Sequence, residues 1–400
     1  MGTALRHPAF RRFFFAALIT QSGNQLERVA LMVMVYQLTG SNATVALVLS
    51  AQLLVSAVVA PLLATWAESQ ERVRLLILSQ LVPGVLVLFL PWLGVRSLLL
   101  LWLLVFAMNI FQRLEYPVIA AATPELVPEE DLDAANGLVA FANRFAEVAV
   151  VGLAGVLVAA VGPALAFYLD SLSYFVAAGL LLGLPRLPGT PPEEGQGYWA
   201  RVLEGFRHIA RTPLLRRSIG ALVTAALLGS VEMVLGVALA IGVMRVGSAG
   251  YGAMEMSLAA GAVLGAVTIA YWTHRLGRGA VFSLSFIFFG LTLFAVGAYP
   301  VFLWVLAAYF LTGYFNQGFL IPLRSLLQVA TPKKLITRVF GAVGATSQTA
   351  VLLGVVGGGA VADRIGVPPT YLLAGLGVVT VGLYLVVTGG LREDGALSRK

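Results

Sequence analysis

Nine ionisable side chains stand inside long apolar runs of this 400-residue chain, and their types are suited to carrying protons. Away from the ends of the runs, acids outnumber arginines by three; the nine are Glu27, Glu115, Glu147, Asp170, Glu232 and Glu255 with Arg28, Arg113 and Arg144. In a bilayer such a charge costs about 3 kcal/mol or more, so each needs a partner, water or a proton. A carboxyl group facing a low-dielectric cavity favours its protonated form and releases the proton when the cavity opens to water.

Glu27 is the first candidate for that chemistry. Gln21, Asn24 and Arg28 follow at spacings of three and four residues, which places them in one polar stripe of a helix beside Glu27. With a rise of about 1.5 Å per residue, Glu27 lies about 20 Å from the inner end of its run. Polar residues at mid-span are costly unless they face a cavity, so we expect the stripe to line a binding site. A buried ion pair between Glu27 and a basic residue is the alternative.

The other ionisable side chains divide by depth and spacing. Glu232 is the second proton-carrying candidate, with a solvated carboxylate near the outer surface as the alternative. Arg144 and Glu147 are three residues apart, so they can pair on one helical face, either structurally or as a gating or coupling pair. Arg113 and Glu115 fall near the inner end of their run, where we expect a structural role.

Two acids and a polar cluster complete the set. Asp170 and Glu255 lie about 10 Å below the outer surface, and Asp170, with serines beside it, is expected to be a hydrogen-bonded structural acid. Tyr314, Asn316 and Gln317 fall near the middle of another run. Because aromatic and amide groups at that depth suit a large, partly apolar ligand, these three are further candidates for lining the site.

The composition of the chain fits a membrane. Hydrophobic residues make up 59% and charged residues 11% of the chain, and the mean hydropathy is +0.90. A soluble domain keeps about a quarter of its residues charged. Since about 20 apolar residues span a bilayer, the sequence predicts an all-α membrane protein with about twelve transmembrane helices. The runs are 13–38, 44–66, 74–94, 97–120, 134–161, 164–185, 217–244, 249–273, 279–299, 300–323, 336–361 and 368–390.

The basic residues indicate orientation rather than a nucleic-acid partner. With the N-terminus inside, the inner segments hold twenty lysines and arginines, whereas the outer segments hold three: Arg96, Arg245 and Arg364. Cytoplasmic loops of membrane proteins carry this excess. The net charge of +7 therefore predicts a multi-pass membrane protein with both termini in the cytoplasm.

Metal and thiol chemistry is not expected. The chain has no cysteine, and its three histidines, His7, His208 and His274, stand beside basic residues and not in ligand-like pairs. The sequence has no phosphate-binding loop of the Walker type, so direct ATP coupling is unsupported. We expect no metal, no cofactor and no catalytic residues, which argues against an enzyme.

A polar tract divides the chain into halves of six runs each. The tract is rich in proline and glutamate, then changes to apolar residues at helical spacing interleaved with arginines, which predicts a short amphipathic helix on the inner leaflet. Pro128 precedes Gly137 by nine residues, and Pro332 precedes Gly341 by the same nine, so the halves are related. We expect two pseudo-symmetric six-helix bundles, with an N-terminal half, a linker and a C-terminal half at 1–185, 186–216 and 217–400.

Several motifs along the chain recur in one known family. They are Phe10-Arg11-Arg12-Phe13, Gln21-Ser22-Gly23-Asn24, Tyr36-Gln37-Leu38-Thr39-Gly40-Ser41, Pro124-Glu125-Leu126-Val127-Pro128, Gly162-Pro163-Ala164, and Pro322-Leu323 with Thr331-Pro332. Together they resemble the major facilitator superfamily, and within it the bacterial branch of macrolide and enterobactin exporters. The resemblance implies a monomeric secondary transporter of the bacterial inner membrane that works by alternating access. It also implies that the first, fourth, seventh and tenth spans surround the cavity.

The loop after the second span resembles the gating signature of the superfamily, with changes. Ala64, Glu68 and Ser69 stand where the family has glycine, aspartate and arginine, while Arg72 and Arg74 remain. A second copy between the eighth and ninth spans has histidine at the acidic position and keeps its basic residues. The resemblance implies that these positions close the cytoplasmic side in one state, through Glu68, Arg72, Arg74, Arg275 and Arg278.

The function predicted from these features is proton-coupled export of amphipathic small molecules such as drugs, macrolides or siderophores. Glu27 and Glu232 are the proposed proton carriers. A translocator of lipids or lysophospholipids with the same fold is one alternative, and an importer of a small metabolite is another. The expected partners are the substrate, protons and membrane lipids, without nucleic acid.

Overall fold

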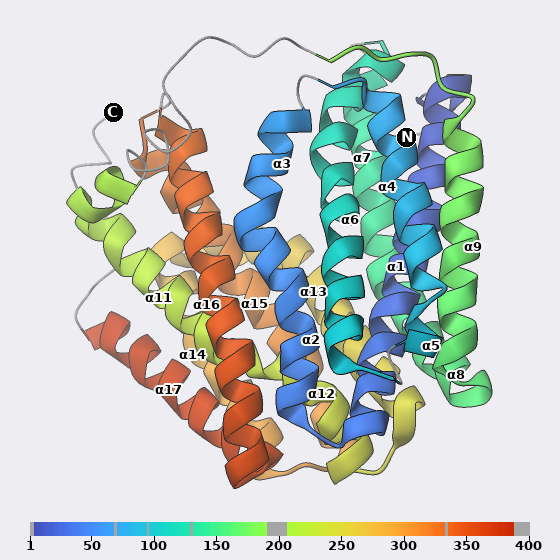
Figure 1. Cartoon of the computed structure of the whole chain (residues 1–400). Helices are drawn as coiled ribbons and strands as arrows, with labels where there is room; N and C mark the ends of the chain where they lie inside the picture. Colours follow the sequence, from blue (N-terminus) through green and yellow to red (C-terminus); the bar gives the residue numbers. More distant parts are fainter. Residues whose placement is uncertain are drawn as a thin grey trace. The chain divides into compact units, whose positions relative to one another are not determined.

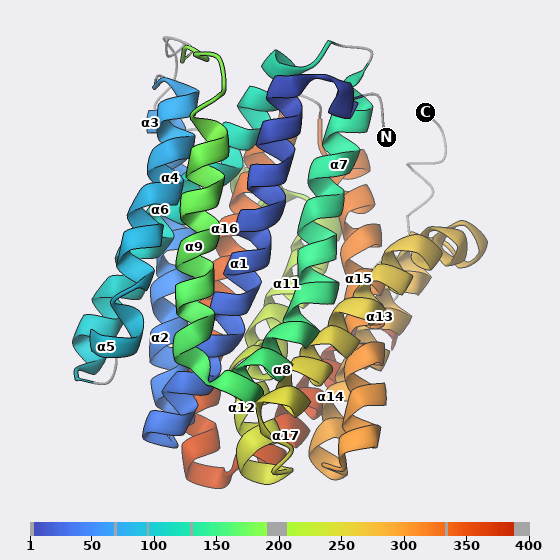
Figure 2. The same ribbon diagram turned by 90° about the vertical axis from the view of Figure 1, so that its right-hand side faces the viewer.

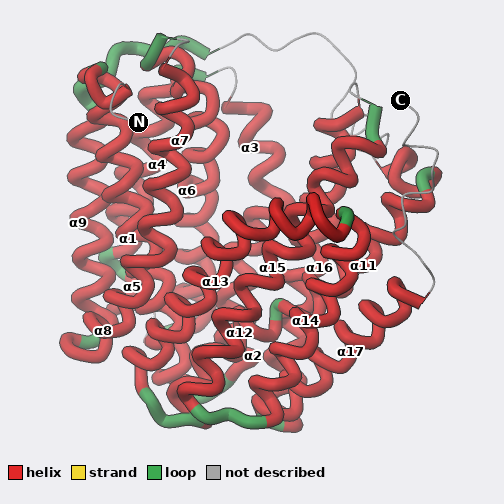
Figure 3. The backbone as a smooth tube through the Cα atoms, turned by 180° about the vertical axis from the view of Figure 1, so that it is seen from behind, coloured by secondary structure: helices red, strands yellow, loops and turns green. Residues whose placement is uncertain are grey.

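The computed structural model describes residues 4–67, 70–93, 96–128, 131–189, 206–332 and 335–387. All regular structure in these ranges is helical (Figure 3). The helices form two compact units. Unit 1 comprises Met1–Gly40, Leu47–Glu194 and Gly247–Met256, and unit 2 comprises Ser41–Ala46, Gly195–Val246 and Ser257–Lys400.

Unit 1 is built mainly from helices of the first half of the chain (Figure 1), although the segment Ser41–Ala46, in which α2 begins, groups with unit 2. Two π-helical turns each join a pair of α-helices of this unit into one continuous helical segment. They are η2 (Val55–Val59), between α2 and α3, and η4 (Ala146–Val150), between α7 and α8. Such turns inside α-helices often mark functional positions. The helices are α1 (Pro8–Thr39), α2 (Asn42–Leu54), α3 (Ala60–Ala67), α4 (Arg72–Val87), α5 (Leu90–Leu93), α6 (Leu98–Leu126), α7 (Leu132–Phe145), α8 (Val151–Val161) and α9 (Pro163–Leu181).

Unit 2 is built mainly from helices of the second half. A π-helical turn, η5 (Leu239–Val243), follows α12, and the Gly247–Met256 segment that begins α13 groups with unit 1. The helices are α11 (Pro213–Gly229), α12 (Val231–Ala238), α13 (Gly247–Leu276), α14 (Arg278–Ala298), α15 (Phe302–Ala330), α16 (Ile336–Ile365) and α17 (Val367–Val387).

Most of these helices are long and apolar enough to cross a membrane. Nine segments within the described ranges meet that standard, and Ala146–Val161 is a shorter apolar helix. The long helices α1 and α15 are not among the nine, although they have 32 and 29 residues. Both carry polar side chains in mid-helix, and these lower the mean hydropathy of helices that otherwise have the length of a span.

Small residues let the helices of unit 1 approach closely. Helix α1 packs against α9 on one side and α7 on the other (Figure 2). A Cβ atom at Gly23 would overlap the side chains of Asp170 and Ser173, so only glycine admits α9 at this distance. On α4, a Cβ atom at Gly84 would overlap the side chain of Tyr174 of α9. These contacts fix the side of α9 that faces the interior of unit 1.

In unit 2, α14 packs against both α15 and α17. Gly290 on α14 and Gly375 on α17 bring the two backbones together, because a Cβ atom on either would meet the backbone of the other helix. The Tyr309 and Tyr371 hydroxyls lie 2.8 Å apart in the buried interior. This packing leaves α11, α15 and α16 to surround the cavity described below.

The predicted linker falls partly outside the described residues, which omit 190–205. Residues 206–211, the end of the predicted amphipathic helix, are helical. The division at 186–216 and the orientation of the termini stay predictions.

Candidate functional site

A cavity of about 550 Å³ lies within unit 1. Its walls come from α1, α2, α6 and α7. Eleven of its thirteen lining residues are polar, which is unusual inside a helical bundle whose core is otherwise apolar. The lining residues are Gln21, Asn24, Gln25, Glu27, Arg28, Gln52, Asn109, Gln112, Arg113, Glu115, Ile119, Thr123 and Val139.

The structure brings the predicted polar stripe of α1 together on one wall of this cavity. Gln21, Asn24, Glu27 and Arg28 all line it. The facing wall belongs to α6, whose polar side chains the sequence argument did not select as site residues. The same spacing criterion could have found them, because Asn109, Gln112, Arg113 and Glu115 also recur within two turns of one helix.

Glu27 takes part in a buried chain of hydrogen bonds. Its side chain is 3% exposed, and Gln112 Nε2 donates to Glu27 Oε2 at 3.1 Å. Gln112 Nε2 also donates to the Tyr174 hydroxyl at 2.7 Å, and that hydroxyl donates to Asn24 Oδ1 at 2.6 Å. Three helices, α1, α6 and α9, are thus connected through one amide. No ion pair joins Glu27 to a cationic side chain that the structure describes.

The arginine of the stripe does have an acidic partner. Arg28 Nη2 lies 2.9 Å from Glu255 Oε2, and both residues belong to unit 1. Glu255 is 5% exposed, so this pair neutralises a carboxylate that burial would otherwise penalise. The partners are 227 positions apart, a separation that no local spacing rule can bridge.

Arg113 and Glu115 line the cavity as well, and the structural role expected from their depth stays a prediction. Glu115 is buried and accepts a hydrogen bond from Gln80. Gln80 Oε1 in turn accepts a hydrogen bond from Thr20 Oγ1 at 2.7 Å. The helical rise gives only the height of a side chain, whereas its direction around the helix axis decides whether it meets a cavity.

The expected pair of Arg144 and Glu147 stays a prediction. Glu147 lies half-buried in the π-helical turn η4. The side chain of Arg144 lies outside the part of the structure that is described.

A second cavity, of about 350 Å³, lies within unit 2. Three of its fourteen lining residues carry polar side chains, Asn316, Arg324 and Ser347, and the remainder are apolar or glycine. Arg324 is exposed and takes part in none of the ion pairs among the described residues. The other lining residues are Leu222, Ala225, Ala226, Phe319, Leu320, Leu323, Leu327, Phe340, Val343, Gly344 and Val351.

The three polar candidates of α15 do not share one face. Asn316 lines the second cavity, but the Tyr314 hydroxyl accepts a hydrogen bond from Thr268 Oγ1 at 3.1 Å. Gln317 packs where α13 and α15 cross, against Gly265. Successive helical residues turn by about 100°, so three neighbours in sequence point in different directions. The remaining candidate, Glu232, lies half-buried in the first turn of α12 in unit 2.

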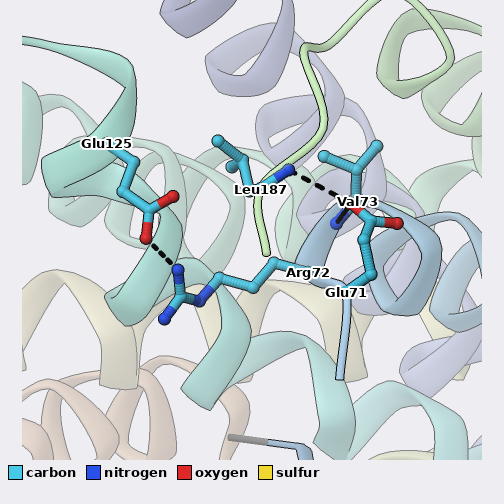
Figure 4. A network of polar contacts seen from close by, with 5 residues as sticks. All are labelled: Glu71, Arg72, Val73, Glu125 and Leu187. Carbon is cyan, nitrogen blue, oxygen red and sulfur yellow. Dashed lines mark hydrogen bonds and ion pairs between the residues drawn. The ribbon is translucent and has the colours of Figure 1, made fainter. Parts of the chain in front are cut away.

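The predicted gating loop of unit 1 is held by a network that Figure 4 shows. Glu71 caps the N-terminus of α4 by accepting from the backbone N–H of Val73 at 3.0 Å and of Arg74 at 2.8 Å. The same carboxylate accepts from Leu187 N at 3.2 Å, and Arg72 N donates to Leu187 O at 2.9 Å. The segment that follows α9 is therefore fastened to the start of α4.

The Arg72 side chain forms the second part of this network. Its guanidinium pairs with the Glu125 carboxylate at the end of α6 (Figure 4). Arg74 is exposed, and Glu68 lies outside the described residues. Glu71 and Glu125 were not predicted as site residues. Glu125 stands in one of the motifs quoted above, but only the fold shows that it faces Arg72.

The corresponding turn in unit 2 is built differently. Gly277, with φ of +83°, ends α13 and begins α14 without a side-chain cap. The Arg275 guanidinium lies 4.7 Å from the centre of the Tyr271 ring, a cation–π contact. Arg278 is in the first turn of α14.

No group of three or more histidine, cysteine or carboxylate side chains in the described ranges could hold a metal ion.

Comparison with known proteins agrees with this architecture. The family model described as transmembrane secretion effector (MFS_3) matches residues 3–396. The enterobactin exporter EntS of Salmonella typhimurium is 29% identical, over 97% of this chain and 94% of that protein. EntS of Escherichia coli O1:K1 / APEC is 27% identical, over 95% of this chain and 92% of that protein.

Solved structures show the same fold. A mutant of the nucleoside transporter NupG superimposes with a TM-score of 0.82, covering 95% of this chain and 99% of that chain at 12% identity. The predicted all-α fold of the major facilitator type is therefore confirmed, and so is the resemblance on which it rested. The chain is a multi-pass membrane transporter of that type, and it belongs to the transmembrane secretion effector family.

Proposed function

We propose that this transporter exports an amphipathic small molecule of the siderophore class and that Glu27 carries the proton moved in exchange. The observation that carries the proposal is a buried carboxyl group on the wall of a polar cavity, hydrogen-bonded to an amide and not paired with a described cation. The likeness to enterobactin exporters over nearly the whole chain supports both the direction and the class of substrate.

The cavity of unit 1 can perform the exchange in a simple sequence. A protonated Glu27 is neutral and tolerates the low-dielectric wall, while an ionised Glu27 requires water or a polar ligand beside it. The amides of Gln21, Asn24 and Gln112 offer donors and acceptors to the polar part of a substrate. Loss of the proton therefore accompanies the opening of the cavity to water, and uptake of the proton accompanies its closure.

A translocator of lysophospholipids is the second candidate, and the cavity of unit 2 favours it. Its walls are largely apolar, and its one charged side chain is the guanidinium of Arg324. This arrangement suits a molecule with an acyl chain and an anionic group. We also propose that 1–185 and 217–400 are the two moving halves, that both termini are cytoplasmic, and that the protein works as a monomer.

Purified protein in proteoliposomes tests the proposal. In proteoliposomes that hold the protein in the inside-out orientation, we expect an imposed pH gradient to drive uptake of enterobactin. We expect lysophosphatidylglycerol to be taken up at least about tenfold more slowly. Glu27→Gln should abolish the response to the gradient but leave exchange of labelled for unlabelled substrate, because the glutamine keeps the shape and loses the proton. Asp363→Asn, which changes an exposed acid, is the matched control.

Two outcomes would contradict the proposal. Unchanged gradient-driven uptake in Glu27→Gln would remove Glu27 from the coupling step. Faster transport of lysophosphatidylglycerol than of enterobactin would favour the lipid translocator.

A further inference from the structure

Asp170 is the most deeply buried of the four buried acids of unit 1, and the exchange described above does not use it. Its exposed fraction is 0%, and it lies in the middle of α9. Oδ1 accepts one long hydrogen bond, from Ser173 Oγ at 3.4 Å. Oδ2 is buried and has no hydrogen-bond partner within the described residues. An ionised carboxylate so placed would leave half of its charge without a donor.

The Asp170 carboxyl group lies directly against α1. Gly23 is the residue of α1 opposite Asp170, and the absence of a Cβ atom there provides the room for the carboxyl group. The next turn of α9 carries Tyr174, whose hydroxyl belongs to the hydrogen-bond chain that includes Glu27. Asp170 is thus one helical turn from the network at the cavity wall.

The charged groups around Asp170 do not favour its ionised form. Helix α9 packs against α1, α4, α5 and α8, and the last two contain no titratable residue. Three arginines of α1 and α4 are engaged elsewhere: Arg12 donates to Gly183 O at 2.8 Å, Arg28 pairs with Glu255, and Arg72 pairs with Glu125. The other two, Arg11 and Arg74, are exposed near the starts of their helices, whereas Asp170 is buried. The groups that interact electrostatically with this part of α9 are Glu27, Tyr174 and Glu115.

Another aspartate in the chain shows what an ionised one requires. Asp363, at the end of α16, is exposed and accepts four hydrogen bonds. The donors are the Ser41 hydroxyl, the Asn42 backbone and side-chain N–H groups and the Ala43 backbone N–H, all at 2.8 to 3.0 Å. Both carboxylate oxygens of Asp363 are satisfied by donors, whereas Asp170 has one long hydrogen bond and no contact with solvent.

We propose that Asp170 holds a proton at neutral pH and acts with Glu27 as a pair of acids that are not ionised together. This deepens the proposed function and rests on it for the coupling step. When Glu27 releases its proton to the cavity, Asp170 keeps its own, because two buried carboxylates in electrostatic contact repel each other. When Glu27 is protonated, Asp170 can lose its proton. The pair therefore exchanges one proton in each transport cycle and always retains the other.

Infrared spectroscopy of the full chain in lipid nanodiscs tests the protonation directly, without substrate. We expect the wild type at neutral pH to show the C=O stretch of protonated carboxylic acids, and Asp170→Asn to remove part of it. Asp363→Asn should remove none of that band. A second variant, Ser173→Ala, keeps the acid and deletes its hydrogen-bond donor, so it should shift the band without removing it. If Asp170→Asn fails to fold, the shift caused by Ser173→Ala alone shows whether Asp170 contributes to the band.

Titration of the same band then tests the pairing. In Glu27→Gln the neighbouring charge is gone, so we expect the band of Asp170 to be lost at a lower pH than in the wild type. A carboxylic-acid band that neither Asp170→Asn nor Ser173→Ala changes would overturn the proposal. An Asp170 band that is lost at the same pH in the wild type and in Glu27→Gln would overturn the pairing. Failure of the proposed function is recognised separately, by gradient-driven uptake that survives Glu27→Gln.

Discussion

Unit 1 surrounds its cavity with eleven polar side chains among thirteen, whereas unit 2 surrounds its own with three among fourteen. The difference arises in the helices: α1 and α6 turn polar stripes inward, while α11 and α16 turn leucine, alanine and valine inward. The two units therefore offer different surfaces to a ligand. Unit 1 offers polar contacts, and unit 2 offers an apolar surface with one positive charge beside it.

The two units also differ at the turn between corresponding helices. Unit 1 caps α4 with Glu71 and pairs Arg72 with Glu125, while unit 2 begins α14 at Gly277 with no side-chain cap. Side-chain hydrogen bonds and an ion pair stabilise the turn before α4, whereas the turn before α14 depends on the backbone conformation of Gly277. The four predictions that follow test this contrast between units.

The largest expected effect is at the ion pair of unit 1. Arg28→Gln leaves Glu255 buried without its partner, and breaking a buried pair costs about 3 to 5 kcal/mol. The Arg28 side chain is 35% exposed, so we discount this to about 2 kcal/mol. Thermal unfolding in detergent measures it, and the double variant with Glu255→Gln should recover most of the loss. Equal stability of wild type and Arg28→Gln would show that the pair is not formed.

Gln112→Leu removes two donated hydrogen bonds, to Glu27 and to the Tyr174 hydroxyl. At about 1 kcal/mol for each, the loss is about 2 kcal/mol, and we expect a transport rate at least about tenfold lower. The matched change in unit 2 is Asn316→Leu, in a wall that is already apolar. Initial transport rates of both variants in proteoliposomes measure the two effects. An equal loss of rate in Gln112→Leu and Asn316→Leu would show that the two cavities do not differ in their need for polar contacts.

Arg324→Gln tests the charge of the second cavity. We expect binding of dodecanoate to weaken about tenfold, or about 1.4 kcal/mol, while binding of dodecanol stays unchanged. The neutral alcohol has the same chain length, so it separates the contribution of charge from that of the apolar walls. Tryptophan fluorescence quenching or calorimetry in nanodiscs can measure both ligands. A parallel loss for the alcohol would mean that the substitution disturbs packing.

The smallest effect is expected at the cap of α4. Glu71→Ala removes acceptors from two N–H groups of that helix and one of Leu187, and cap removal costs about 1 kcal/mol. Glu71→Gln retains an acceptor and should cost less. Hydrogen exchange at the first turn of α4 reports the change locally, with the first turn of α14 as the uncapped reference. Unaltered exchange would show that the Glu71 cap adds nothing.

Sequence reasoning reaches far into the fold because the lipid environment simplifies it. Apolar runs of bilayer length predict the helices, and the polar stripe of α1 predicts which face of that helix meets a cavity. The same reasoning stops at the π-helical turns, since one extra residue in a helical turn leaves no mark on hydropathy. It also assigned Tyr314, Asn316 and Gln317 to one site, although their directions on α15 differ.

The contacts that complete the site could not be predicted in this way. The pairing of Arg28 with Glu255 and of Arg72 with Glu125 joins segments that are distant in sequence, and each acid has several basic residues as equally plausible partners. Asp170 was expected to be a hydrogen-bonded structural acid, and the structure shows one hydrogen bond, from Ser173 to Oδ1. Its missing partner at Oδ2 depends on how α9 approaches Gly23, which only coordinates can show.

The attachment of Leu187 to the start of α4 has a consequence for engineering this transporter. Two hydrogen bonds, through Glu71 and the backbone of Arg72, clamp the chain just after α9. A protease site or an affinity tag inserted before Leu187 would break that clamp and loosen unit 1. Inserted at Gly189, the same sequence leaves the clamp intact, so Gly189 is the position at which we expect an insertion to be tolerated.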